Sequence, residues 1–229
     1  MTDFETDEKA QKRMESQAVP EADLQIILKL HRIRLGWSYL LQETLADRMT
    51  GFPCENEEFF VRRQLRAAQL KVSEWFKKMS RLYKWPSIDG WMWEIDFASG
   101  QAVPQKQRPR VNDIKNQQNK TEVDSFVEGP IMTLGDMDCD IIRRLLEKRE
   151  AMADSLRSAV RRILNRETSL EELNDTVQRL GAAHIDVNDW FSKMADTYQW
   201  PKPKSLRWQY RVDMAEKQVL IERTGEYPL

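Results

Sequence analysis

The residues LKVSEWFKKMSRLYKWP at positions 70–86 return as IDVNDWFSKMADTYQWP at positions 185–201, 115 residues further along the chain. Eight of the 17 aligned positions are identical, where unrelated segments would share roughly one. The matches include two tryptophans, a phenylalanine and a proline. We interpret the chain as an internal duplication that forms two related lobes.

The duplicated segment has the pattern of an amphipathic helix. Its shared apolar residues follow the spacing i, i+3, i+4, i+7 and i+11, which is one face of an α-helix. In the first copy these residues are Val72, Trp75, Phe76, Met79 and Tyr83. Helical spacing also runs through residues 24–49 and 140–166. A second helical stretch connects each of these to the duplicated segment, so we expect three helices in each lobe.

After the Trp-Pro pair that ends each copy, the periodicity changes to two. Trp91, Trp93 and Ile95 stand at alternate positions, and Ser99 and Gly100 provide a turn before a second strand. Residues 208–212 and 219–221 repeat this pattern. The predicted fold class is therefore mainly α with small β-hairpins (α+β), an internal duplication of a helix-helix-helix-hairpin unit.

This order of elements resembles the winged helix-turn-helix class. In the second lobe, Leu180 and Gly181 are followed by Val187 and Trp190 at the spacing of a glycine turn and two buried anchors of a recognition helix. The resemblance covers about 20 residues, and the first lobe has Arg66 at the turn glycine. The alternative is one uninterrupted helix over residues 57–84, packed on the first helix as an antiparallel hairpin.

The composition changes along the chain indicate four segments. We expect a flexible N-terminal tail over residues 1–20, the first lobe over residues 21–106, a charged linker over residues 107–135 and the second lobe over residues 136–229. Residues 104–120 carry a net charge of +4 and residues 121–140 one of −6.

The residue types present offer little for catalysis. The two histidines, His31 and His184, and the two cysteines, Cys54 and Cys139, do not correspond under the repeat, and none lies in a metal-ligand spacing. No phosphate-binding loop or nucleophile elbow is present. We predict a protein that is not an enzyme, with no cofactor, no metal, no catalytic residues and no small-molecule substrate. Without an apolar run long enough for a signal or a membrane span, we expect a cytoplasmic or otherwise intracellular protein with no membrane partner.

A net charge of −1 confines any nucleic-acid contact to a local surface. The solvent side of the first duplicated helix and the basic half of the linker are rich in Lys and Arg, whereas Asp186, Asp189 and Asp196 lie on the same side of the second copy. The predicted nucleic-acid-binding residues are Arg62, Arg63, Arg66, Lys71, Lys77, Lys78, Arg81, Lys84, Lys106, Arg108 and Arg110.

Two functions follow from these patterns. The first is a tandem winged-helix-like nucleic-acid-binding or regulatory protein that contacts DNA or RNA through the first lobe, with the second lobe binding a protein partner or another copy of the chain. The second is a protein–protein adaptor or assembly subunit whose two lobes present differently charged surfaces and make no nucleic-acid contact.

Overall fold

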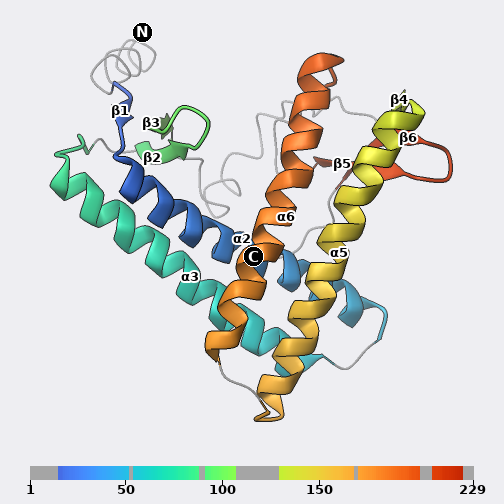
Figure 1. The fold of residues 1–229 in the computed structure, drawn as a ribbon, viewed down its shortest axis with the longest axis horizontal. Helices are drawn as coiled ribbons and strands as arrows, with labels where there is room; N and C mark the ends of the chain where they lie inside the picture. The colour runs from blue at the N-terminus through green and yellow to red at the C-terminus, as the bar shows by residue number, and fades with distance from the viewer. Residues whose placement is uncertain are drawn as a thin grey trace, which may run out of the picture. The chain divides into compact units, whose positions relative to one another are not determined.

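A computed structural model describes residues 15–51, 54–87, 91–106, 129–167, 170–201 and 208–223 (Figure 1). The elements are, in order, β1 (Gln17–Ala18), α2 (Glu21–Met49), α3 (Glu55–Leu82), β2 (Trp91–Asp96), β3 (Gln101–Lys106), β4 (Gly129–Thr133), α5 (Asp136–Leu164), α6 (Leu170–Thr197), β5 (Trp208–Asp213) and β6 (Gln218–Arg223). The prediction of a mainly helical protein with small antiparallel hairpins is confirmed.

The prediction of three helices before each hairpin is wrong. Residues 55–82 form one helix of 28 residues that passes through Arg66, and residues 170–197 form another that passes through Gly181. A single glycine inside a helix costs only about 1 kcal/mol relative to alanine, which is too little to break a helix with a long buried face. The uninterrupted alternative is therefore what the structure shows, and neither α3 nor α6 contains a helix-turn-helix.

By their contacts the residues divide into two compact units. Unit 1 comprises Met1–Arg34 and Arg63–Glu122, and unit 2 comprises Leu35–Arg62 and Val123–Leu229. The division passes through α2 and α3, so that each of these two helices contributes one end to each unit.

Two short strands lie in segments for which the sequence predicted a tail and a linker. β1 lies within the last residues of the predicted tail and is followed by the buried Val19. β4 occupies the end of the predicted linker. Neither strand shows the alternating pattern that identified the hairpins, because β1 is two residues long and β4 contains Gly129 and Pro130. Residues 1–14 and 107–128 lie outside the described part of the chain.

In unit 1 a three-stranded antiparallel sheet, in the order β1-β3-β2, packs on the start of α2 and the end of α3. The amphipathic pattern of α3 explains this packing, because its apolar face is buried against α2 and the sheet. The buried core consists of Val19, Ile27, Trp75, Met79, Trp85, Ile95 and Ala102.

Unit 2 contains a sheet with the same arrangement, in the order β4-β6-β5, and α5 and α6 lie beside each other as a long helical hairpin (Figure 1). Its core next to the sheet consists of Leu134, Cys139, Ile142, Val187, Trp190, Met194, Ala195, Trp200, Val212 and Val219. Seven of these ten residues occupy positions that correspond in the repeat to the seven core residues of unit 1.

The aromatic rings in the two cores have nearly the same geometry. Trp75 and Trp85 have ring centroids 6.4 Å apart at 61°, and Trp190 and Trp200 have theirs 6.4 Å apart at 63°. The adjacent Trp-Phe pairs are both separated by 5.2 Å. The duplicated sequence therefore forms equivalent local packing in each unit.

Unit 2 also includes the second half of α2, which approaches α6 very closely. A Cβ atom on Gly36 would lie 2.3 Å from the backbone oxygen of Val177 and 2.8 Å from its Cγ2. Glycine is therefore required at this crossing for steric reasons. Trp37 packs edge-on to Phe60 nearby, at 6.1 Å between ring centroids.

Candidate nucleic-acid interface

The exposed side of α3 in unit 1 carries most of the predicted phosphate-binding residues. The exposed cations of the helix in unit 1 are Arg63, Arg66, Lys71, Lys77, Lys78 and Arg81, and Lys84 is exposed two residues beyond the end of α3. At about 100° per residue, the six helical positions cover roughly 140° of the helix circumference. Trp75 and Met79 are buried on the opposite side. Glu74 is the only acidic residue among the cations.

These cations have no ion-pair partner among the described residues. In the described part of unit 1, none of the Lys or Arg side chains forms an ion pair with another described residue, and 11 basic residues stand against six acidic ones. In the described part of unit 2, 15 basic residues stand against 21 acidic ones, and many of the arginines are neutralised locally. Unit 1 therefore presents positive charge that is available to an external anion.

The remaining predicted residues are placed differently. Arg62 belongs to unit 2 and forms an ion pair of 2.7 Å with Glu58, which also contacts Arg48 at 2.9 Å. These arginines hold the pKa of the Glu58 carboxyl below its ordinary value, Arg62 through the largest effect. Lys106 ends strand β3. Arg108 and Arg110 lie outside the described residues.

The equivalent exposed side of α6 has the opposite character. The positions that correspond to Lys71, Lys77 and Arg81 are occupied by Asp186, Ser192 and Asp196. Asp186 is bound by Lys148 of α5 at 2.8 Å. This surface would repel phosphate, as its sequence predicts.

A network of charges also joins α2, α3 and α5 inside unit 2. The Arg157 side chain, 17% exposed, lies 3.4 Å from both Asp47 and Asp154, 3.7 Å from Glu57 and 4.0 Å from Glu43. Four carboxylates around one guanidinium leave little positive charge for a ligand. We therefore assign Arg157 to the packing of these helices.

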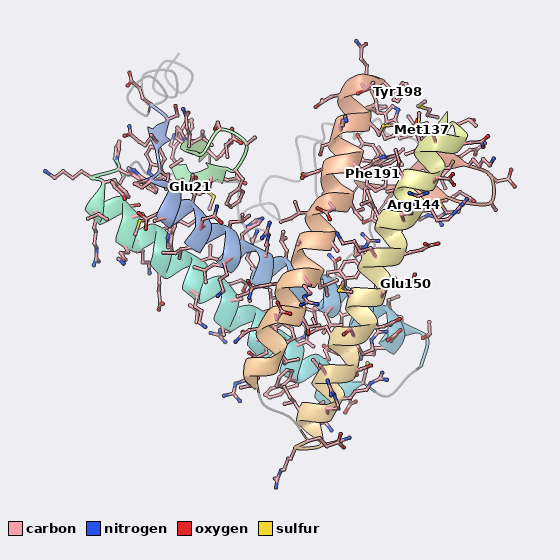
Figure 2. The ribbon with its side chains drawn as sticks, viewed as in Figure 1. Glu21, Met137, Arg144, Glu150, Phe191 and Tyr198 are labelled. Atoms are coloured by element: carbon pink, nitrogen blue, oxygen red, sulfur yellow. The ribbon has the colours of Figure 1, made fainter. Side chains whose placement is uncertain are left out.

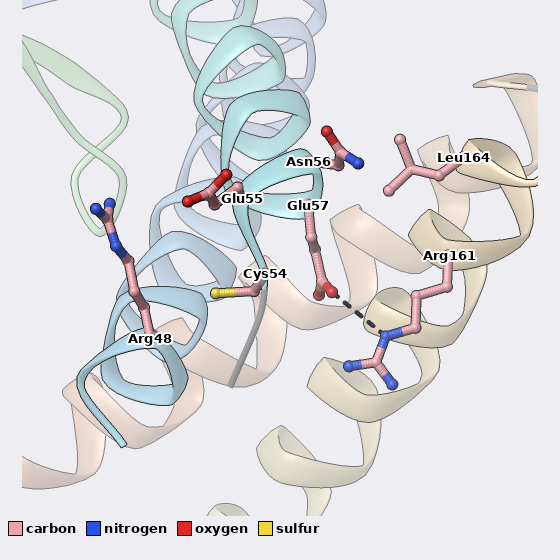
Figure 3. A pocket seen from close by; sticks show the side chains of 7 residues that line it. All are labelled: Arg48, Cys54, Glu55, Asn56, Glu57, Arg161 and Leu164. Carbon is pink, nitrogen blue, oxygen red and sulfur yellow. Dashed lines mark hydrogen bonds and ion pairs between the residues drawn. The ribbon is translucent and has the colours of Figure 1, made fainter. Parts of the chain in front are cut away.

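The hollow at the same end of unit 2 has a volume of about 440 Å³ (Figure 3). It is lined by Arg48, Cys54, Glu55, Asn56, Glu57, Arg161 and Leu164. Both arginines are bound to glutamates, with Arg161 3.3 Å from Glu57. Burial, followed by the charge of Glu57, raises the pKa of the Cys54 thiol, which makes it a weak nucleophile. Among its lining residues, the hollow therefore offers neither an unpaired cation nor a reactive thiol.

Sequence reasoning missed an exposed apolar pair at the start of α5. Met137 is 76% exposed and Ile141, one turn later, is 43% exposed. Figure 2 shows Met137 near the first turn of α5, with Arg144 and Glu150 further along that helix. These two residues have the i, i+4 spacing of neighbours on one helix face, and that face is not the one buried through Cys139 and Ile142. This spacing is the sequence signal that identifies such a pair.

A second group outside the predictions surrounds His31 in unit 1. Its ring lies 5.3 Å from that of Phe97, and its Nδ1 accepts a hydrogen bond of 3.3 Å from Arg34. Burial, aided by the charge of Arg34, lowers the pKa of His31 to about 4. The imidazole is therefore neutral near pH 7 and adds no charge to the surface of unit 1.

No protein-family model, curated protein or solved structure matches the chain significantly. None of the helices in the described ranges has the length and apolar character needed to cross a membrane. The surfaces of the two units are therefore the features from which a function can be inferred.

Proposed function

We propose that this chain is a non-enzymatic binding protein, built by internal duplication, that contacts nucleic acid through the exposed cations of α3 in unit 1. The observation that carries the proposal is the row of exposed cations without ion-pair partners on one helix. Such a row of Lys and Arg attracts the phosphate backbone of nucleic acid.

The duplication explains why only one surface would bind. The equivalent core positions and the equal ring geometries support descent from one copied segment. Since the exposed positions of α3 and α6 have different charges, the two copies would have diverged on their surfaces. The contact would not use a helix-turn-helix, because α3 is continuous.

The direct test removes three positive charges from α3 and compares the DNA affinity with that of a variant that loses three positive charges in unit 2. The triple variant Lys77→Gln, Lys78→Gln, Arg81→Gln should weaken binding to a 24-base-pair DNA by at least about 30-fold and reduce the slope of log affinity against log salt by about 2.7. Fluorescence anisotropy over a salt series measures both quantities.

The matched control removes three exposed cations from unit 2. Arg144, Arg162 and Lys193 also lack an ion-pair partner among the described residues, so Arg144→Gln, Arg162→Gln, Lys193→Gln should leave affinity within about twofold of the original. Glu74→Gln should strengthen binding several-fold, a gain that partial unfolding cannot imitate. Equal affinity of both triple variants would reject the proposal.

The second candidate function is a protein–protein adaptor, and the exposed Met137 and Ile141 favour it. Burial of two such side chains at an interface would remove apolar surface from water. Under this alternative, Met137→Ser with Ile141→Ser would abolish self-association in sedimentation velocity while the α3 variants changed nothing. Retention of a protein partner without any affinity for DNA would support the adaptor.

A further inference from the structure

We infer that α3 lies across a groove of double-helical DNA, with one group of its cations on the phosphates of each strand. This inference rests on the proposed function and names the form of nucleic acid that the surface fits. It is carried by the spacing of the cations along the helix and by the position of its aromatic rings.

The exposed cations form two groups. The first is Arg63 and Arg66. The second is Lys77, Lys78 and Arg81, with Lys84 two residues beyond the end of α3. The eleven residues from Arg66 to Lys77 correspond to about 16 Å along the axis at about 1.5 Å per residue. Between the groups, the outermost side chains are Leu70, Ser73 and Glu74, and Lys71 lies to one side.

This spacing matches the dimensions of B-form DNA. The major groove is about 12 Å wide and accepts an α-helix, with a phosphate backbone on either side. Two cationic groups about 16 Å apart can therefore reach both backbones while the middle of the helix lies over the groove. Glu74 then lies over the groove, away from the phosphates, where its negative charge is least unfavourable.

A single strand would require different features. Proteins that hold single strands usually combine a basic groove with aromatic rings on which bases stack. Trp75 and Phe76 pack into the core of unit 1, and Phe60 packs against Trp37. Phe59 is exposed, but it lies in the unit 2 part of α3, one turn before Arg63. From Arg63 to Leu82 the exposed arc of α3 carries no aromatic side chain. The interval between the two cationic groups therefore suits the backbones of a duplex and not unstacked bases.

The experiment compares four probes of 24 nucleotides or base pairs with the full-length protein at about 100 mM salt. These are duplex DNA, each of its separated strands and duplex RNA of the same sequence. We expect duplex DNA to bind at least about tenfold more tightly than any other probe, because A-form RNA has a narrow major groove that excludes an α-helix.

Variants at the two ends of the row test the bridging geometry. Arg63→Gln with Arg66→Gln, and separately Lys77→Gln with Arg81→Gln, should each lower the affinity for duplex DNA at least about tenfold. Each should bring the ratio of duplex to single-strand affinity close to one. Circular dichroism checks that the helices remain.

The outcomes separate the inference from the proposed function. If no probe binds at low salt, the proposed function fails and this inference with it. If single strands or duplex RNA bind as tightly as duplex DNA, or if only one cationic group affects the duplex, the inference is wrong and the proposed function stands. Preference for duplex DNA that depends on both groups supports the inference.

Discussion

The sheet-facing cores of unit 1 and unit 2 are nearly equivalent, but the exposed sides of α3 and α6 are not. Trp75 and Trp190 lie in similar aromatic surroundings, whereas Lys71 and Arg81 correspond to Asp186 and Asp196. Packing restricts a buried position to residues of similar shape, while an exposed position can change charge at little cost in stability. The two copies therefore share their local packing and differ in the charge of their exposed sides.

The largest expected effect tests the equivalence of the two cores. Trp75→Ala should destabilise unit 1, and Trp190→Ala should destabilise unit 2, each by about 4 kcal/mol, because both changes leave a large cavity. Amide hydrogen exchange resolved by residue measures the loss in each unit. Losses that differ by more than about 2 kcal/mol would show that the two aromatic clusters are not energetically equivalent.

The next prediction transfers the α6 surface to α3. Lys71→Asp, Lys77→Ser and Arg81→Asp together should reduce DNA affinity by roughly 100-fold, since five units of positive charge are lost from the contact. Thermal unfolding should change little because all three positions are exposed. If the affinity survived this transfer, the difference in charge between α3 and α6 would have no functional meaning.

A third prediction concerns a contact of unit 2 that involves no charge. Gly36→Ala should destabilise the protein by about 2 kcal/mol, because the backbone oxygen at 2.3 Å cannot move aside easily. Urea unfolding provides the measurement. The control is Gly135→Ala, where an added Cβ meets no atom within 4 Å. Because Gly135 is the N-cap of α5 and alanine is a poorer N-cap than glycine, we expect a smaller loss of about 0.5–1 kcal/mol there.

The smallest expected effect near neutral pH is a pH dependence of unit 1 that comes from His31 and grows towards pH 4. The pKa of His31 falls from 6.5 to about 4 on folding. Between these two pH values His31 is therefore protonated in the unfolded chain and neutral in the folded unit. Stability should therefore fall as the pH decreases from 6.5 towards 4. The equivalent residue of α5 is Leu146.

His31→Leu tests this assignment by giving unit 1 the residue that α5 carries. Hydrogen exchange of the unit 1 amides between pH 7 and pH 4, corrected for intrinsic rates, should show a smaller loss of protection in the variant. An unchanged profile would mean that other groups control the acid response.

The periodicity of the sequence was sufficient for some elements and not for others. Both hairpins and the helical character of residues 24–49 and 140–166 followed from apolar spacing, because that spacing reflects which side of an element is buried. The continuity of α3 and α6 did not follow. Gly181 is typical of a turn in isolation, but α6 passes through it, with Leu180 and Ala183 buried on one face of the continuous helix.

The candidate nucleic-acid interface could likewise be predicted only in part from the sequence. Charge and periodicity placed Lys77 and Arg81 on the solvent side of a helix, as the structure has them. They did not show that Arg62 is held by Glu58, because ion pairs depend on distances in the folded chain.

The amino-acid sequence by itself determined the repeat, the buried faces of the helices, the two hairpins and the opposite charges of the two duplicated segments. The repeat follows from comparing two stretches of the sequence, and the other features follow from the order of neighbouring residues. Only the tertiary structure decided that the compact units divide α2 and α3, that β1 and β4 complete the sheets, and which cations lack a partner. Those features depend on contacts between residues far apart in the chain, and local spacing carries no information about such distances.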